Sequence, residues 1–299
     1  MTTAAAKTIG PNYTQKKRIR SVVRVLCVVL VTLLFVSPLY ISFIYALKTP
    51  DEMGTSSPLA LPNRLYIGNF VDVITKNDLF RTGFINSLIC TVCIVAVLSV
   101  ITPMAAYAIS RYENKLVKFV YYIFMTGILI PFQCIMFPEY VNLKAVGLIN
   151  TLTGFTIVRA GFQIGMCMMV ITNFVKTVPV DMEEAAYIDG ASISRTFWTI
   201  VFPLMKPINV TMLVINTLNA WNDYPVAVAI LQSEEKRTLP LAQLIYTSES
   251  GVEVNLAFAF FCLCMIPVLI LYLFAQRYIV SGIMGTVKSY AQNRFADSG

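Results

Sequence analysis

The chain alternates between long apolar runs and shorter polar segments. Six mainly apolar runs occur at about 25–47, 85–109, 117–138, 154–175, 208–231 and 256–276. A helix of about 20 apolar residues crosses the hydrocarbon core of a bilayer, which is about 30 Å thick. Strands of a membrane barrel would instead alternate polar and apolar residues over segments of about ten residues. The pattern therefore predicts an all-α integral membrane protein with six transmembrane helices.

The amino-acid composition also indicates a protein that is embedded in a lipid bilayer. Apolar residues make up 57% of the chain and charged residues only 13%, whereas soluble domains carry about 25% charged residues. This balance excludes a soluble enzyme, a disulfide-stapled secreted domain and a disordered chain. The seven cysteines all lie in apolar runs, where a thiol packs as a small hydrophobe. The sequence contains no histidine, so we expect no metal site and no histidine-based catalysis.

Basic residues at the ends of the runs predict the topology. With the N-terminus in the cytoplasm, 15 of the 23 Lys and Arg residues fall on the cytoplasmic side, as the positive-inside rule requires. We therefore expect both termini in the cytoplasm, and we attribute the net charge of +7 to topology rather than to nucleic-acid binding. The expected organisation is a basic N-terminal segment (1–24), a six-span domain (25–288) and a cytoplasmic tail (289–299). No cleavable signal peptide is expected, because the N-terminus is polar.

The cytoplasmic loop at 176–207 has a pattern of its own. Three acidic residues follow Pro179, and both features suit a helix N-terminus. Gly190 then interrupts the pattern, and a second apolar-periodic segment follows. This predicts two short helices joined by a turn. A hairpin that only braces the spans would also fit this composition.

Specific residues of this loop resemble a known motif. Glu184-Ala185-Ala186 is followed after three residues by Gly190, and after nine more by Ile200, one residue and then Phe202-Pro203. The spacing resembles the EAA loop of ABC-importer permeases, with Phe202 where leucine is usual. Other segments resemble carbohydrate-importer permeases of the maltose-permease (MalG) type. They are 69–71, 86–88, 105–108 with Arg111, 188–191, 220–224, 235–240 and 276–278.

The resemblance implies that the loop is a coupling hairpin seated in a groove of an ATPase subunit, with its glutamate paired to a basic group there. The residues implied to couple are Glu184, Ala185, Ala186, Asp189, Gly190, Ile200 and Pro203. This chain lacks a GxxxxGK[ST] phosphate-binding loop, so we expect a non-catalytic subunit without a cofactor. The implied partners are a second, non-identical permease, two ATPase subunits that bind ATP and Mg, and an extracytoplasmic solute-binding protein.

Two intramembrane charges mark a candidate substrate path. Trp221-Asn222-Asp223-Tyr224 combines aromatic faces with polar groups, and charges inside a membrane usually face a cavity or a partner. Gln163 is a weaker candidate for the same path. Asn222 and Asp223 would equally serve to brace the bundle. We expect Arg159 to extend outward along its span to the membrane surface.

The last outer loop, 232–255, is polar and acidic. In MalG-type permeases the corresponding loop contacts the binding protein. The resemblance therefore implies contact through a flexible tip. The residues of this tip are Ser248, Glu249, Ser250 and Gly251. An unengaged acidic loop would fit the composition as well.

The sequence thus predicts the permease subunit of an ATP-driven importer for a carbohydrate, most simply an oligosaccharide, in a bacterial or archaeal cytoplasmic membrane. One alternative keeps the importer but changes the substrate to glycerol phosphate, a polyamine or another small solute. The other alternative is a secondary transporter or a membrane enzyme. A secondary transporter would show paired broken spans in two internal repeats, and an enzyme would need a cluster of catalytic side chains.

Overall fold

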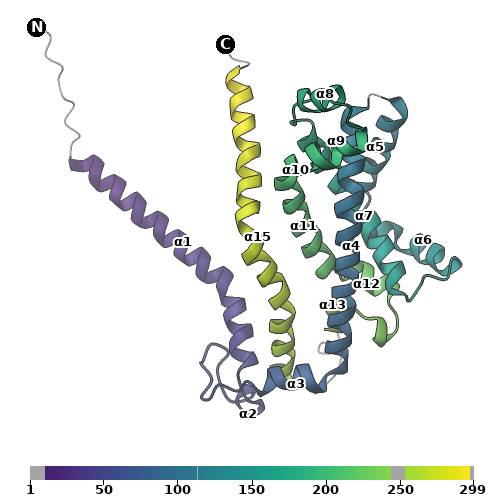
Figure 1. Cartoon of the computed structure of the whole chain (residues 1–299). Coiled ribbons are helices and arrows are strands. Elements are labelled where there is room, and N and C mark those ends of the chain that lie inside the picture. Colours follow the sequence, from purple (N-terminus) through teal and green to yellow (C-terminus); the bar gives the residue numbers. More distant parts are fainter. Residues whose placement is uncertain (1–10, 113, 244–252, 297–299) are drawn as a thin grey trace, which may run out of the picture. The chain divides into compact units, whose positions relative to one another are not determined.

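The computed structural model describes residues 11–112, 114–243 and 253–296. Within these ranges every regular element is a helix, which confirms the predicted all-α class (Figure 1). The chain divides into two compact units. Unit 1 is formed by the described parts of 1–70 and 253–262, and unit 2 by those of 71–252 and 263–299.

Among the described residues, four helices are long and apolar enough to cross a membrane. They are α1 (Pro11–Ala46), α4 (Asp78–Arg111), α7 (Leu152–Val175) and α15 (Val254–Ala296). Each covers one predicted run to within a residue. Helical backbones satisfy all their internal hydrogen bonds, which is what a bilayer demands of a spanning segment.

The third predicted run, 117–138, is not a single helix. It is divided between α5 (Lys115–Ile128) and α6 (Phe132–Ala145), which meet at 109°. Pro131 lies at this break as the N-cap of α6. Proline has no amide hydrogen and keeps the preceding residue out of the helical conformation, so the predicted span bends at this point.

The fifth predicted run, 208–231, is also divided. Helix α11 (Lys206–Trp221) ends before Asn222, and α12 (Pro225–Ile230) begins after Tyr224. A proline at the first position of a helix loses no hydrogen bond, but within a helix it would break one. The three residues between the helices lie in an irregular segment. If α5 with α6 counts as one bent span, and Ile193–Leu204 with α11 as another, the described chain has up to six spans, which is the predicted number. The second bent pair covers 193–221 rather than the predicted 208–231.

Short helices connect the long ones. They are α2 (Pro50–Met53), α3 (Gly68–Lys76), α8 (Asp181–Ile188), α9 (Ile193–Thr196), a π-helix (Phe197–Val201), α10 (Phe202–Leu204), a 3₁₀ helix (Glu234–Lys236) and α13 (Leu239–Ala242).

A buried asparagine organises unit 1. The Nδ2 of Asn69 donates to the carbonyl oxygens of Ala46 at 2.9 Å and Lys48 at 2.8 Å. Its Oδ1 accepts from the Nδ2 of Asn255 at 2.7 Å. This side chain satisfies the Ala46 carbonyl, which the end of α1 leaves without a helical partner, and the Lys48 carbonyl just after the helix.

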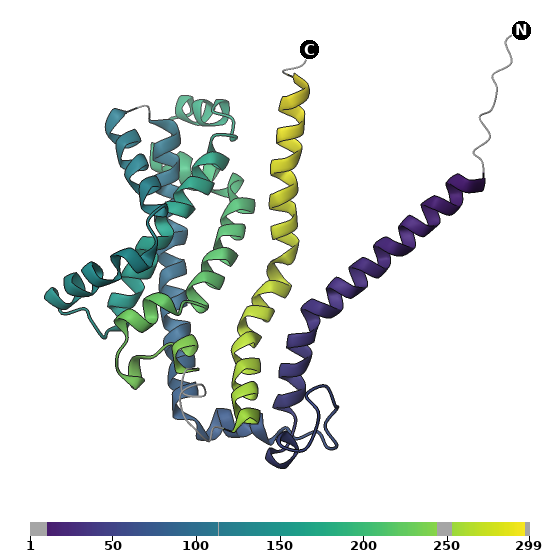
Figure 2. The same ribbon diagram turned by 180° about the vertical axis from the view of Figure 1, so that it is seen from behind.

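The core of unit 2 is formed by α4, α7 and α11, and both views show α4 and α7 side by side (Figures 1 and 2). Leu98, Phe155 and Ile171 are almost completely buried there. Gly165 of α7 lets α5 approach closely, since a Cβ atom at this position would lie 2.8 Å from the Phe124 carbonyl oxygen.

Two of the sequence motifs that resemble importer permeases contact each other near the start of α4. The Nδ2 of Asn86 donates to the carbonyl oxygens of Glu235 and Arg237, each at 2.9 Å. The Oγ of Ser87 accepts from the amide of Leu239 at 2.7 Å. These contacts attach the polar segment before α13 to α4 across about 150 residues of sequence.

Candidate functional site

The hairpin, residues 181–204, contains the predicted coupling motif. Helix α8 begins with acidic residues at 181, 183 and 184 in its first turn, where carboxylates interact favourably with the helix dipole. It ends at Ile188, and Gly190 follows two residues later with a φ of +79°, in the left-handed region. This conformation strains any residue with a Cβ atom. The predicted turn at this glycine is confirmed.

Replacing Gly190 with alanine is expected to destabilise the turn by about 1 kcal/mol, because left-handed backbone costs other residues about 1–2 kcal/mol. Gly190→Asn should cost less, since asparagine tolerates this conformation. Amide hydrogen exchange over residues 181–196 measures the difference. Equal exchange rates in the alanine variant and the wild type would contradict the prediction.

The second arm of the hairpin is less regular than predicted. Ser192 caps α9 by accepting a hydrogen bond from the Arg195 amide at 3.3 Å. The chain then widens into the π-helix, which contains Ile200, before α10, which contains Pro203. Single π-helical turns are rare and often occur at functional sites.

The two adjacent glutamates of α8 lie in different environments, because Glu183 is buried and Glu184 is exposed. Glu184 and Ala185 are exposed, as are Asp189 and Gly190, whereas Ala186 is buried. Among the other predicted coupling residues, Ile200 is half-buried and Pro203 is exposed. Sequence reasoning missed Ile188, whose side chain is 87% exposed at the end of the helix. The exposed face of α8 thus combines acidic, small and apolar residues.

Glu183 was also missed, although it lies beside the motif. Its side chain is 3% exposed and forms an ion pair with Arg111 at 2.8 Å. Its Oε2 accepts from the Tyr107 hydroxyl, also at 2.8 Å. The available signal was a lone arginine, Arg111, just after the apolar run 85–109, on the same predicted cytoplasmic side as the loop with the adjacent glutamates.

The two charges inside the predicted spans pair with each other. The Nε of Arg159 on α7 lies 2.7 Å from the Oδ2 of Asp223. The Oδ1 of Asp223 accepts from the amides of Val226 at 3.0 Å and Ala227 at 3.3 Å, at the start of α12. The expectation that Arg159 extends outward was therefore wrong. Both charges lie in contacts within the bundle, which reduces the cost of burying them.

The other predicted path residues lie in different surroundings. Asn222 and Tyr224 are exposed in the break between α11 and α12. Gln163 is buried on α7, and its Nε2 has no hydrogen-bond partner among the described residues. The predicted binding-protein tip, 248–251, lies outside the described residues.

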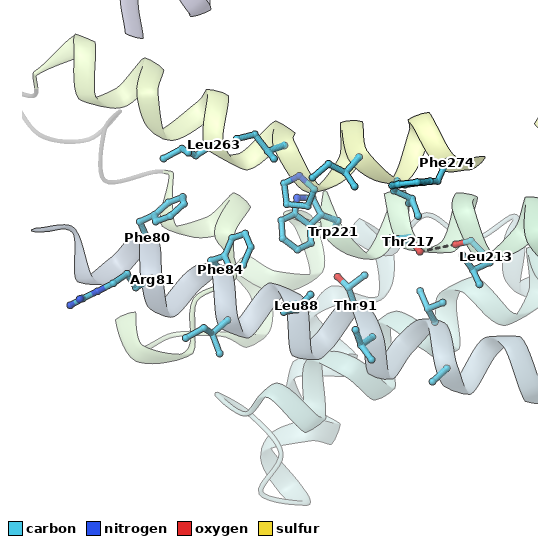
Figure 3. A pocket seen from close by; sticks show the side chains of 18 of the residues that line it. Phe80, Arg81, Phe84, Leu88, Thr91, Leu213, Thr217, Trp221, Leu263 and Phe274 are labelled. Carbon is cyan, nitrogen blue, oxygen red and sulfur yellow. Dashed lines mark hydrogen bonds between the residues drawn. The ribbon is translucent and has the colours of Figure 1, made fainter. Parts of the chain in front are cut away.

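Trp221 lies beside a large apolar cavity of about 1180 Å³ between α4, α11 and the 263–274 segment of α15. Its indole Nε1 donates to the Cys264 carbonyl oxygen at 3.2 Å, and its ring meets Phe84 edge-on at 5.7 Å between centroids. Figure 3 shows these rings against Leu263, with the Arg81 side chain extending away from them. The cavity is far more apolar than a carbohydrate site would be.

Comparison with known proteins decides the family. A model of the family "Binding-protein-dependent transport system inner membrane component" matches residues 100–285, which contain the hairpin and most of unit 2. The chain belongs to this family. It is therefore a multi-pass permease of the inner membrane, as predicted.

Several curated relatives resemble the permease over most of their length. It is 32% identical to the "Probable starch degradation products transport system permease protein AmyC" of Thermoanaerobacterium thermosulfurigenes, over 87% of this chain and 94% of the relative. It is 31% identical to the melibiose/raffinose/stachyose import permease MelC of Bacillus subtilis, over 84% and 91%. It is 34% identical to the multiple sugar-binding transport permease MsmG of Streptococcus mutans, over 81% and 87%.

Solved structures support the fold of the permease. A chain of a bacterial ABC transporter that imports the acidic polysaccharide alginate matches with a TM-score of 0.78. The match covers 93% of the permease and 99% of that chain at 22% identity. A chain from the alginate transporter in complex with a pentasaccharide-bound periplasmic protein matches with a TM-score of 0.67 at 14% identity, covering 88% and 95%.

Proposed function

We propose that the permease is one of two non-identical membrane subunits of an ATP-driven importer for an oligosaccharide. The observation that carries this proposal is the similarity, at 31–34% identity over 81–87% of the chain, to three permeases named for sugar transport. An extracytoplasmic binding protein delivers the sugar. A separate pair of ATPase subunits binds ATP and Mg and performs the hydrolysis. The relatives give no support to glycerol phosphate or a polyamine as substrate.

The exposed face of α8 is the proposed contact with the ATPase, on the cytoplasmic side of the membrane. Ala185 is small and exposed, so a partner surface can approach the helix closely. Glu184 offers an exposed carboxylate to a basic group of the partner. Ile188 adds an exposed apolar side chain that a pocket in the partner would bury.

The proposed sugar path passes the break between α11 and α12. Asn222 and Tyr224 are exposed there. Asn222 presents its amide oxygen, since its Nδ2 donates to the Leu218 carbonyl oxygen at 3.0 Å, and Tyr224 presents an aromatic ring. The polar groups of Trp221 and Asp223 already have partners within the chain. We therefore propose that these two residues stabilise the break between α11 and α12 rather than bind the sugar. Gln163 and the 248–251 tip keep their proposed roles in the path and in binding-protein contact.

A charge reversal at Glu184 tests the proposed function. The assay measures ATP-driven uptake of a panel of labelled oligosaccharides by the complete importer reconstituted in vesicles. Wild type should take up one class of these sugars, and Glu184→Lys should lower that uptake more than about tenfold, because the reversed charge would repel the basic group of the ATPase. Asp51→Lys is the control, since Asp51 is an exposed acid in the first turn of α2, outside the hairpin. Its uptake should stay within about twofold of wild type, because a charge at a helix end contributes less than about 1 kcal/mol.

Two outcomes would contradict the proposal. Wild-type vesicles that take up no oligosaccharide, while the ATPase responds to a binding protein loaded with another solute, would reject the carbohydrate assignment. Uptake driven by an ion gradient without any ATPase chain would reject the importer itself.

A further inference from the structure

Glu183 and Glu184 are adjacent in sequence, yet only Glu184 is exposed. Both carboxylate oxygens of Glu183 are used within the chain. Arg111 Nε donates to its Oε1 at 2.8 Å, and the Tyr107 hydroxyl donates to its Oε2 at the same distance. A carboxylate held by a guanidinium and a hydroxyl is strongly constrained in position.

The same two residues of α4 also contact the segment before α8 and the rest of the hairpin. Arg111 Nη2 donates to the Val178 carbonyl oxygen at 2.8 Å, just before α8. The Tyr107 hydroxyl lies 3.2 Å from that of Tyr187, near the end of α8. The Tyr107 ring packs 5.2 Å from the ring of Phe197 in the second arm. The end of α4 therefore contacts both arms of the hairpin, as its position beside α8 and α9 in Figure 1 shows.

Helix α4 connects this contact to the opposite end of the bundle. Its 34 residues rise about 50 Å. Near its start, Asn86 and Ser87 hold the segment from Glu235 to Leu239, which precedes the predicted binding-protein tip. A single continuous helix thus reaches from the hairpin to the segment that leads into the outer loop.

We propose that Arg111, Tyr107 and Glu183 form a latch that makes α8 and the end of α4 one rigid element. This inference rests on the proposed ATPase contact and adds how a movement of the ATPase reaches α4. The exposed Glu184 receives the displacement from the ATPase, and the buried Glu183 passes it to α4. The three latch residues are positioning residues, because they act through helix movement.

The first test measures sugar uptake and ATP hydrolysis in the same vesicles of the complete importer. Glu183→Gln keeps the shape of the side chain but removes its charge, so uptake per ATP hydrolysed should fall about tenfold while the complex still assembles. Tyr107→Phe removes one hydroxyl and keeps the ring against Phe197, so it should lower the ratio less. Glu184→Gln is the matched neighbour, and it should lower ATP hydrolysis itself. A latch that only stabilises the fold would change assembly and leave the ratio unaltered.

The second test needs no sugar. Spin labels on cysteines at Asp181 and Tyr112, both exposed, report the distance between α8 and the end of α4 in an otherwise cysteine-free chain of the assembled complex. This distance should be the same in the nucleotide-free state and with the ATPase trapped by vanadate. In Glu183→Gln it should broaden or shift on trapping.

The outcomes distinguish a failure of the proposed substrate from a failure of the proposed latch. A wild-type importer that moves no oligosaccharide but keeps its label distance on trapping rejects the proposed substrate and supports the latch. A label distance that changes on trapping in wild type overturns the latch, as does a Glu183→Gln complex with the wild-type ratio of uptake to ATP hydrolysis. Should Glu183→Gln fail to reach the membrane, Tyr107→Phe with an unaltered ratio and label distance overturns it.

Discussion

The Arg159→Met variant is expected to lose about 3–5 kcal/mol of folding stability, because it leaves the buried Asp223 carboxylate without its cation. The two side chains are only 14% and 7% exposed. No other cation pairs with Asp223 among the described residues. The measurement is the thermal unfolding midpoint of the detergent-solubilised permease, together with its amount in the membrane.

A double variant separates bracing from a role in the sugar path. Arg159→Met with Asp223→Asn removes both charges, and the asparagine oxygen can still accept from the amides at the start of α12. We expect most of the lost stability to return, since a neutral pair has no charge to desolvate. A double variant as unstable as Arg159→Met alone would contradict the ion-pair explanation. Full stability with loss of uptake would instead place the pair in the path.

Gly154→Ala is expected to destabilise the permease by about 1–3 kcal/mol, the usual cost of overpacking a core. A Cβ atom at this position would overlap the backbone carbonyl oxygen of Leu148 and lie 3.1 Å from the Oγ1 of Thr151, the residue that caps α7. The backbone before α7 would have to move, because a carbonyl cannot rotate away as a flexible side chain does.

Gly161 supplies the matched control on the same helix. A Cβ atom there would meet no atom within 4 Å, so Gly161→Ala should be neutral or slightly stabilising through better helix propensity. The unfolding midpoints of the two variants measure the contrast. Equal midpoints would show that the start of α7 yields more easily than the geometry indicates.

Prolines illustrate how far the sequence could predict the spans. Pro38, Pro103 and Pro267 lie inside α1, α4 and α15 without ending them. Pro131 and Pro225 lie at breaks. A membrane helix tolerates proline where neighbouring groups satisfy the freed backbone and breaks where they do not. Those neighbours come from elsewhere in the chain, so the five prolines cannot be distinguished from sequence alone.

In the candidate site, too, the sequence predicted some features and only the fold explains others. The EAA spacing located the hairpin and its turn at Gly190, because a left-handed residue and an acidic first turn are local requirements. The adjacent glutamates look alike in sequence. Only the approach of Arg111, 72 residues earlier in the chain, buries Glu183 and leaves Glu184 exposed.

By itself, the sequence determined that this chain is a helical membrane protein, where its six apolar runs lie and to which family of permeases its hairpin motif belongs. These properties follow from local composition and spacing, since each apolar run must satisfy its own backbone within the bilayer. Only the tertiary structure decided which two of these runs break and which charges pair. Breaks and ion pairs depend on groups brought together from distant segments, because a buried charge or a free carbonyl is stable only beside the partner that the fold supplies.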